Sequence, residues 1–407
     1  MRKVSISGSK KRYELLFVLI LVAVNIVLII MPNRYDKSSN YSYTVGKIVE
    51  VDNTELKQYG LIKQGSQYLT VEIKRGELKG QVFETDNNLI GKMELDKVLS
   101  EGDTVYVEYS TIGDGSIYVK VVDFYRLGTE MLLFTVFGVM LILFAGFTGL
   151  KTLLSFTTTL LVLWKVMIPL YLQGFNPVLI AFAIVSALTL AIIFLVGGFT
   201  RKGFVAFLGS ISGVLVTLIL SLSFSDPFYI NGSVMPFAET LLYSGFAHLD
   251  LNQLFLASIF IGSSGAVMDI GMDLSASMQE VVFKNPDITT RELMFSGFRV
   301  GRAVVGTMTT TLLFAYSGGY LTLLMAFMAQ GVNTSAMLNL NYFSSEVLIT
   351  VIGSFGLVLT APLTAIIGAF VFTRKGSELL ITANQEAGQS VDKKAQELGS
   401  AINDSVD

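Results

Sequence analysis

Long apolar stretches joined by short polar connections dominate the pattern of this chain. The first covers residues 13–32 and follows five cationic side chains, Arg2, Lys3, Lys10, Lys11 and Arg12. A stretch of about 20 apolar residues is long enough to cross a bilayer as a helix. Similar stretches predict seven more transmembrane helices, over residues 130–147, 152–172, 178–196, 204–224, 253–279, 293–316 and 346–373.

The segment between the last two of these stretches breaks the pattern. Ser317, Gly318 and Gly319 interrupt it, residues 320–328 are apolar but short, and residues 331–345 are rich in polar side chains. If the short stretch crossed the bilayer, the cations at 374–375 would lie outside, against the usual excess of Lys and Arg in cytoplasmic loops. We therefore expect residues 318–345 to form a re-entrant or broken element. This gives eight spans, with nine as the alternative.

The cations also predict the orientation. Those before the first span, and Arg201 and Lys202 in a later loop, place these segments in the cytoplasm. No cleavage site of the A-x-A type follows the first span, which favours an uncleaved anchor over a signal peptide. The expected organisation is a cytoplasmic basic stub (1–12), an anchor helix (13–32), an extracellular segment (33–126), a multi-pass transmembrane domain (127–373) and a cytoplasmic polar tail (374–407).

The extracellular segment alternates apolar and polar positions with the period of β-strands. Five strands are predicted, over residues 43–51, 67–74, 79–86, 103–110 and 116–124, with turns at Gly80, Gly102 and residues 113–115. Five short antiparallel strands indicate a small all-β barrel of the OB-like or SH3-like kind. Its basic and aromatic residues are mixed with acids, so we expect a protein-docking cap rather than an oligonucleotide-binding surface.

Composition and charge exclude several functions. Charged residues are only 15% of the chain, against about 25% in soluble domains. The net charge of −3 and the lack of a basic stripe argue against a nucleic-acid partner. The chain has no cysteine and one histidine, His248, which excludes thiolate zinc sites and multi-histidine metal centres. With no nucleophile, metal or nucleotide motif, we expect no cofactor and no enzymatic activity; a membrane enzyme acting on lipid-linked substrates is the least supported alternative.

The sixth and seventh predicted spans carry the candidate chemistry. Asp269 and Asp273 are four residues apart and share a helix face that continues to Glu280. In the next span, Arg299 and Arg302 share a face. Ionisable side chains inside a bilayer are costly, so by default they are functional hypotheses.

We expect these two spans to form a hairpin that turns near residue 288, which would place residues equidistant from the turn side by side. This predicts the ion pairs Asp273–Arg302 and Glu280–Arg299. Such pairs can also serve only to fix helix register.

Across the same hairpin, the residue expected opposite Asp269 is Thr307, so Asp269 has no cationic neighbour. It is therefore the candidate for a group that binds a cation or changes its protonation. Asn333 and Ser335 are candidates to line the same site. In another span, Gly209 and Gly213 form a GxxxG pair, a signal for close helix packing.

Several motifs of the sixth and seventh spans resemble a known family. They are GAVMD at 265–269, Glu280, NP at 285–286, SG at 296–297, GR at 301–302 and GTM at 306–308. Together with the β-rich segment, they resemble the YibE/F-like bacterial multi-pass membrane proteins. The resemblance covers nearly the whole chain and implies a location in the bacterial plasma membrane, without implying a substrate.

The expected function is that of a transporter or channel-like permease for a cation or a proton-coupled small solute. Ionisable groups inside the bilayer and a broken element are features that transporters use to build sites at the membrane midplane. The alternative is a non-catalytic envelope scaffold, assembly or sensor protein. In that case the external β domain would bind a protein partner and the charged residues would hold helices together.

Overall fold

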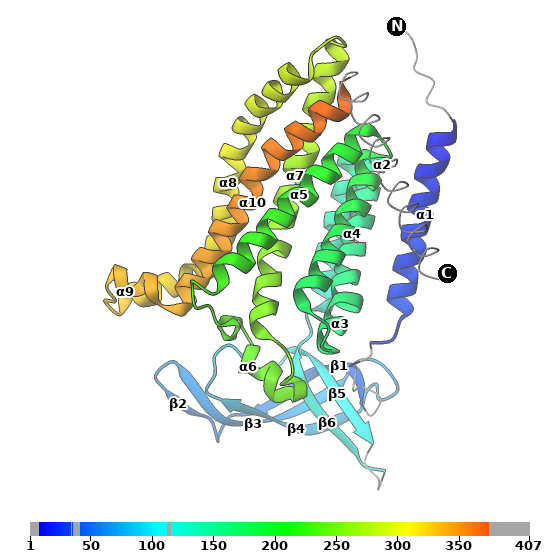
Figure 1. The fold of residues 1–407 in the computed structure, drawn as a ribbon. Coiled ribbons are helices and arrows are strands. Elements are labelled where there is room, and N and C mark those ends of the chain that lie inside the picture. Colours follow the sequence, from blue (N-terminus) through cyan, green and yellow to red (C-terminus); the bar gives the residue numbers. More distant parts are fainter. Residues whose placement is uncertain (1–7, 34, 36–40, 112–114, 374–407) are drawn as a thin grey trace, which may run out of the picture. The chain divides into compact units, whose positions relative to one another are not determined.

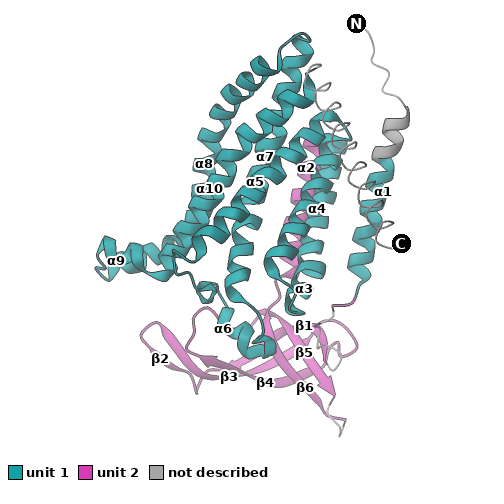
Figure 2. Ribbon diagram, in the orientation of Figure 1, with its two compact units in different colours: residues 1–31, 147–407 teal, residues 32–146 magenta. Residues whose placement is uncertain are grey.

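The computed structural model describes residues 8–33, 35, 41–111 and 115–373 (Figure 1). The expected cytoplasmic tail at 374–407 and most of the basic stub lie outside these residues. The chain divides into two compact units, one made of residues 1–31 and 147–407 and the other of residues 32–146 (Figure 2).

The smaller unit contains a six-stranded antiparallel sheet. Its strands are β1 (Ser42–Asp52), β2 (Lys57–Tyr59), β3 (Ile62–Ile73), β4 (Val82–Ile90), β5 (Thr104–Thr111) and β6 (Ile117–Phe124). They pair in the order β2-β3-β1-β5-β6, and β4 pairs with β3. The sheet curls toward closure, since the Thr85 hydroxyl of β4 donates to the carbonyl of Val119 in β6 at 2.8 Å. The result is a half-barrel.

The half-barrel has its own hydrophobic core, because alternate side chains of β1, β3, β5 and β6 point inward. The fully buried members include Ile48, Val71, Ile73, Val105 and Val107. All five predicted strands are present in the predicted order, and β2 is a sixth strand that was not predicted. The strand predicted over 79–86 begins later, at Val82, because residue 80 is a glycine turn with φ of 85°.

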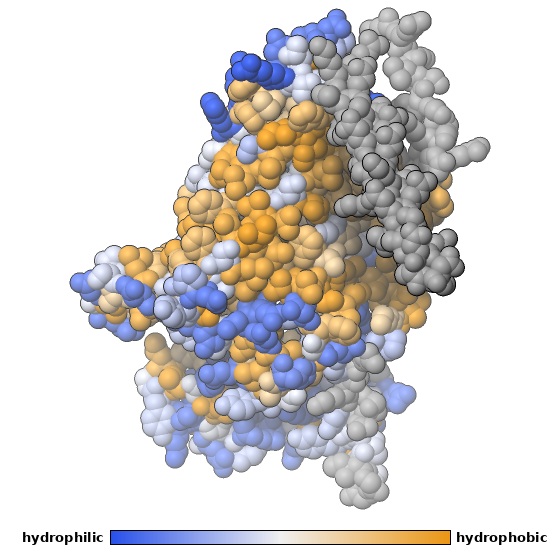
Figure 3. Space-filling model, in the orientation of Figure 1, coloured by the Kyte–Doolittle hydropathy of each residue, from blue (hydrophilic) through white to orange (hydrophobic). Residues whose placement is uncertain are grey.

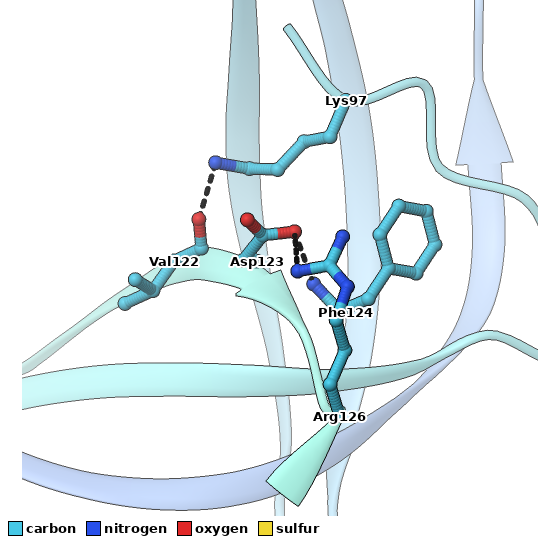
Figure 4. A network of polar contacts seen from close by, with 5 residues as sticks. All are labelled: Lys97, Val122, Asp123, Phe124 and Arg126. Atoms are coloured by element: carbon cyan, nitrogen blue, oxygen red, sulfur yellow. Dashed lines mark hydrogen bonds and ion pairs between the residues drawn. The ribbon is translucent and has the colours of Figure 1, made fainter. Parts of the chain in front are cut away.

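The loop from residue 91 to 103 seals one end of the half-barrel. Leu99 is buried in the core, and the Lys97 ammonium donates to the carbonyl of Val122 in β6 (Figure 4). Beside it, Asp123 accepts from the backbone N–H of Phe124 at 2.6 Å and pairs with the guanidinium of Arg126 at 3.0 Å (Figure 4). These contacts fix the end of β6 immediately before the helix that follows it, α2 (Leu127–Val162).

The larger unit is helical. The helices of the chain are α1 (Gly8–Ile30), α2 (Leu127–Val162), η2 (Leu163–Met167), α3 (Ile168–Leu172), α4 (Pro177–Gly197), α5 (Arg201–Ser225), η3 (Gly232–Val234), α6 (Ala238–Leu241), η4 (Leu242–Phe246), α7 (Leu251–Lys284), α8 (Thr290–Ala329), α9 (Thr334–Asn339) and α10 (Asn341–Phe372). Within the larger unit, α10 packs against α5, α7 and α8 (Figure 1).

Among the described residues, six helices are long and apolar enough to cross a membrane: Leu127–Leu172, Pro177–Gly197, Arg201–Ser225, Leu251–Lys284, Thr290–Ala329 and Asn341–Phe372. The apolar part of α1, Leu15–Ile30, is shorter. Apolar side chains cover much of the visible surface of these helices (Figure 3). The first of the six contains 46 residues, and Gly146 interrupts its helical backbone with φ of 57° and ψ of −131°.

The expected break near residue 318 is wrong. Helix α8 continues through Gly318 and Gly319 to Ala329. Each glycine costs a helix about 1 kcal/mol relative to alanine, whereas an unsatisfied backbone group in lipid costs several kcal/mol. Continuing the helix is therefore the cheaper solution. The helix ends instead just before Gly331, whose φ of 69° turns the chain so that the N–H of Val332 bonds the carbonyl of Phe327 at 3.0 Å.

Small residues allow close packing between α5 and α10. A methyl group at Gly209 would overlap the Thr364 side chain, and one at Gly213 would overlap Thr360. The third glycine is on the opposite helix: Gly356 of α10 leaves room for the Thr217 side chain of α5. The GxxxG spacing alone is a weak signal with many false positives, and here the structure shows close packing at both glycines.

Candidate polar site in the membrane-spanning helices

Helices α7 and α8 form the predicted hairpin, and capping residues define its ends. The carboxylate of Asp250 accepts from the N–H of Asn252 at 3.0 Å and starts α7. Helix α8 starts with a capping box, in which Thr289 and Glu292 each bond the other's backbone N–H. The connection between the helices is only five residues long, 285–289, so the two helices are neighbours.

Helix α7 has one buried face and one exposed face. Ser263, Val267, Ile270, Gly271, Leu274 and Met278 lie on the buried face. Asp269, Asp273 and Glu280 are all exposed on the other. The orientation follows from close packing at Gly271, where a methyl group would overlap Ser210 of α5. The three carboxylates share a face of α7, and we call this face the acidic stripe.

Asp269 lies deep in the helix. At 1.5 Å per residue it is about 27 Å from Leu251 and about 22 Å from Lys284. The hydrocarbon core of a bilayer is about 30 Å thick, so any such length of α7 that crosses the core contains Asp269. A carboxylate at that depth cannot face lipid without a large cost. It requires water, a cation or a protein neighbour.

The predicted ion pairs Asp273–Arg302 and Glu280–Arg299 are wrong. Among the described residues, none of these four side chains lies within 4 Å of an opposite charge. The reason is the rotation of α8.

Two glycines set that rotation. Gly297 packs against Met278 and Ala365, and Gly301 against Leu274 and Ala361. Each residue turns a helix by about 100°, so Arg302 lies a quarter turn beyond this contact face. There it lines a hollow with residues of α10 rather than meeting α7.

Thr307, Asn333 and Ser335 do not join the acidic stripe through any hydrogen bond of the described residues. Thr307 is exposed and donates to the carbonyl of Val304 at 3.0 Å. Asn333 caps α9 and accepts from the N–H of Ser335 at 2.9 Å. Thr307 and the end of α8 at Ala329 are separated by about 33 Å along the helix. Asn333 and Ser335, which follow that end, therefore lie at a different level along α8 from Thr307.

Sequence reasoning missed one polar group, the hydroxyl of Tyr316 on α8. It is buried and has no hydrogen-bond partner in the part of the chain that the structure describes. A methyl group at Gly262 of α7 would lie 2.9 Å from this hydroxyl, and one at Gly353 of α10 would lie 3.4 Å from it. Gly262 is on the acidic stripe, about two turns from Asp269. No local sequence pattern indicates this contact, because the three residues lie on different helices.

No group of three or more His, Cys, Asp or Glu side chains placed to hold a metal ion occurs among the described residues. Asp269 and Asp273 could contribute two carboxylate ligands to a cation, with water completing the shell.

These features define a multi-span membrane protein with an N-terminal half-barrel domain. Residues 133–374 match the family described as YibE/F-like protein, and residues 39–124 match the YibE/F family N-terminal domain. The chain belongs to the YibE/F-like family, as its motifs predicted. No curated protein matches it, and neither does any solved structure.

Proposed function

We propose that this protein is a permease for a cation or a proton-coupled small solute, with a path along the acidic stripe of α7. The observation that carries the proposal is Asp269, exposed on its helix at a depth that lies inside the hydrocarbon core. A water-lined path would hydrate its carboxylate and give it a role. Asp273 extends the path toward Lys284, and the unpartnered hydroxyl of Tyr316 extends it the other way.

The proposed topology has eight spans. Helix α1 is the first, and the break at Gly146 divides Leu127–Leu172 into two. At 1.5 Å per residue, 46 helical residues would extend about 69 Å, more than twice the hydrocarbon thickness. An even number of spans places both termini in the cytoplasm of a bacterial cell and the half-barrel outside its plasma membrane.

The alternative is a scaffold or assembly protein, and one observation favours it. Of the 18 residues that form the most apolar part of α8, only 6% are buried within the chain. A helix that exposed can be covered by a protein partner as well as by lipid, and such a partner could also supply cations to the acidic stripe. In that case the half-barrel would provide a second docking surface outside the membrane.

Flux measurements in proteoliposomes distinguish the two functions. Purified protein is reconstituted with a pH-sensitive dye inside, and gradients of H⁺, Na⁺, K⁺ and Mg²⁺ are applied one at a time. Asp269→Asn keeps the shape of the side chain and removes its charge. Asp287→Asn is the matched control, because Asp287 is exposed in the loop between α7 and α8.

The permease predicts flux in the wild type and in Asp287→Asn, and a loss of about tenfold or more in Asp269→Asn. Unchanged flux in Asp269→Asn would remove the acidic stripe from the path. No flux of any tested ion in wild-type protein would favour the scaffold.

A further inference from the structure

Two neighbouring hollows lie along α8, and α10 lines one of them. The first is about 320 Å³ and is lined by Phe298, Gly301, Arg302, Val305, Val358, Ala361 and Pro362. The second is about 450 Å³ and is lined by Arg291, Glu292, Phe295, Phe298, Arg299 and Arg302. Phe298 and Arg302 line both hollows, so the two are adjacent. We call them together the arginine groove.

The polar end of the groove carries an excess of positive charge. Arg291, Arg299 and Arg302 contribute three cations, and Glu292 contributes one anion. Glu292 is already engaged, because its carboxylate accepts from the N–H of Thr289 at 3.1 Å and from its hydroxyl at 2.8 Å. Within the described chain, none of the three guanidinium groups has a carboxylate within 4 Å. The three arginines of the groove therefore have no anionic partner in the described chain.

The other end of the groove is apolar. Val305, Val358, Ala361 and Pro362 form its walls, and Val358 is 40% exposed. Both walls belong to helices that are long and apolar enough to span a membrane. A soluble anion would satisfy the arginines and leave this apolar surface uncovered. An anionic amphiphile would satisfy both ends.

We propose that the arginine groove binds one anionic phospholipid from the bilayer. Arg299 and Arg302 are three residues apart on one helix face, a spacing that brings two guanidinium groups to one phosphate. Arg291, about 12 Å nearer the start of α8, would meet the outer part of the headgroup. An acyl chain lies along Phe298, Val305 and Val358. Basic pockets between transmembrane helices are suited to acidic headgroups in this way.

The test uses the delipidated full-length protein in dodecyl maltoside. Native mass spectrometry measures the binding of dioleoyl phosphatidylglycerol and of dioleoyl phosphatidylcholine, which share acyl chains and differ in headgroup charge. Expected are one tightly bound phosphatidylglycerol per chain and at least about tenfold weaker binding of phosphatidylcholine. Inorganic phosphate, added as a competitor, should displace neither lipid.

Three variants localise the site. Arg299→Gln with Arg302→Gln should weaken phosphatidylglycerol binding by about tenfold or more, because both charge-assisted hydrogen bonds are lost. Arg299→Lys with Arg302→Lys should retain most of the affinity. Val358→Trp keeps every cation and fills the apolar end, so it should weaken the binding of phosphatidylglycerol. The matched control is Arg201→Gln with Lys202→Gln at the start of α5, away from the groove, and it should bind as the wild type does.

Each contrary result overturns the proposal. Unchanged phosphatidylglycerol binding in the Arg299→Gln, Arg302→Gln variant would place the lipid elsewhere. Equal binding of the two lipids would remove the role of charge, and displacement by phosphate would indicate a soluble anion. A dimer that buries the groove and excludes phosphatidylglycerol would identify the occupant as a second copy. None of these outcomes depends on whether the acidic stripe conducts ions.

Discussion

Two buried carboxamides, one in each unit, show how differently the two parts of this molecule accommodate polar groups. Gln67 in the half-barrel makes four hydrogen bonds, donating to Asn53 and to the carbonyl of Leu99 and accepting from Asn87 and from the N–H of Leu99. Asn25 in α1 donates to Thr158 at 2.7 Å and to Leu21 at 2.9 Å. Its carbonyl oxygen has no partner in the described part of the chain.

The difference follows from the unfolded reference state of each unit. A polar group of the half-barrel is hydrated when the domain unfolds, so burial must replace every hydrogen bond with water. A polar group of a membrane helix can find other partners in its unfolded state within the membrane, and one interhelical bond then contributes little. The half-barrel therefore depends on complete hydrogen bonding, and the helical unit on the fit of small side chains.

Gln67→Leu should give the largest effect. It leaves the N–H and carbonyl of Leu99 unpaired in the core, and Asn87 keeps only its bond to the carbonyl of Lys97. The expected cost is about 4 kcal/mol in the free energy of unfolding of the half-barrel. Hydrogen exchange of β3 amides in the full-length protein should accelerate by roughly three powers of ten. Gln58→Leu, at an exposed position of β2, is the control and should leave exchange unchanged. Slow exchange in Gln67→Leu would show that the network is dispensable.

Gly213→Ala should come next, because the added methyl group overlaps Thr360 at the contact between α5 and α10. Overpacking of this kind costs about 1–3 kcal/mol. The melting temperature of the detergent-solubilised protein should fall accordingly. Gly306→Ala is the matched control, since a methyl group at Gly306 meets nothing within 4 Å. Equal melting temperatures for the two variants would contradict the proposed packing.

Asn25→Leu should have a small effect, about 0.6 kcal/mol. A double-mutant cycle with Thr158→Val isolates the bond between the two side chains, because Thr158 also donates to the carbonyl of Leu154 at 2.8 Å. Coupling is measured from the equilibrium unfolding of α1 and its neighbours in detergent. A coupling above about 2 kcal/mol would mean that the helical unit uses buried hydrogen bonds as the half-barrel does.

Asp96→Asn should have the smallest effect of the four, and this effect should be present at neutral pH and disappear in acid. The Asp96 carboxylate accepts from the N–H groups of Ile90, Gly91 and Lys92, at 3.0, 2.6 and 2.8 Å. The bond from Ile90 is the main cause of its pKa lying below the ordinary value of 3.8. A depressed pKa in the folded state gives stability that is present above the unfolded pKa and is lost as pH falls through the folded pKa.

The half-barrel of the wild type should therefore lose stability on acidification below about pH 4. In Asp96→Asn the part of this loss that is due to Asp96 should disappear. The measurement is hydrogen exchange of β4 amides as a function of pH, corrected for the intrinsic exchange rate. Identical pH profiles for the two proteins would exclude this carboxylate as a source of the acid sensitivity.

The candidate site shows how far the sequence could be taken. The four-residue spacing of Asp269 and Asp273 predicted their common face, because helix periodicity is local. Counting outward from the turn predicted the level of Arg302 along the hairpin, near Asp273. It could not predict the direction of the side chain, because the rotation of α8 about its axis depends on what Gly297 and Gly301 contact in α7 and α10.

By itself, the sequence determined the membrane-spanning class, the family, the strands of the half-barrel and the shared face of the acids. All of these depend on composition or on periodicity over a few neighbouring residues. Only the tertiary structure decided that α8 runs unbroken to Ala329, that Arg299 and Arg302 turn toward the groove beside α10, and that Tyr316 faces Gly262. The physical reason is that helix rotation is set by glycine contacts between segments far apart in the chain.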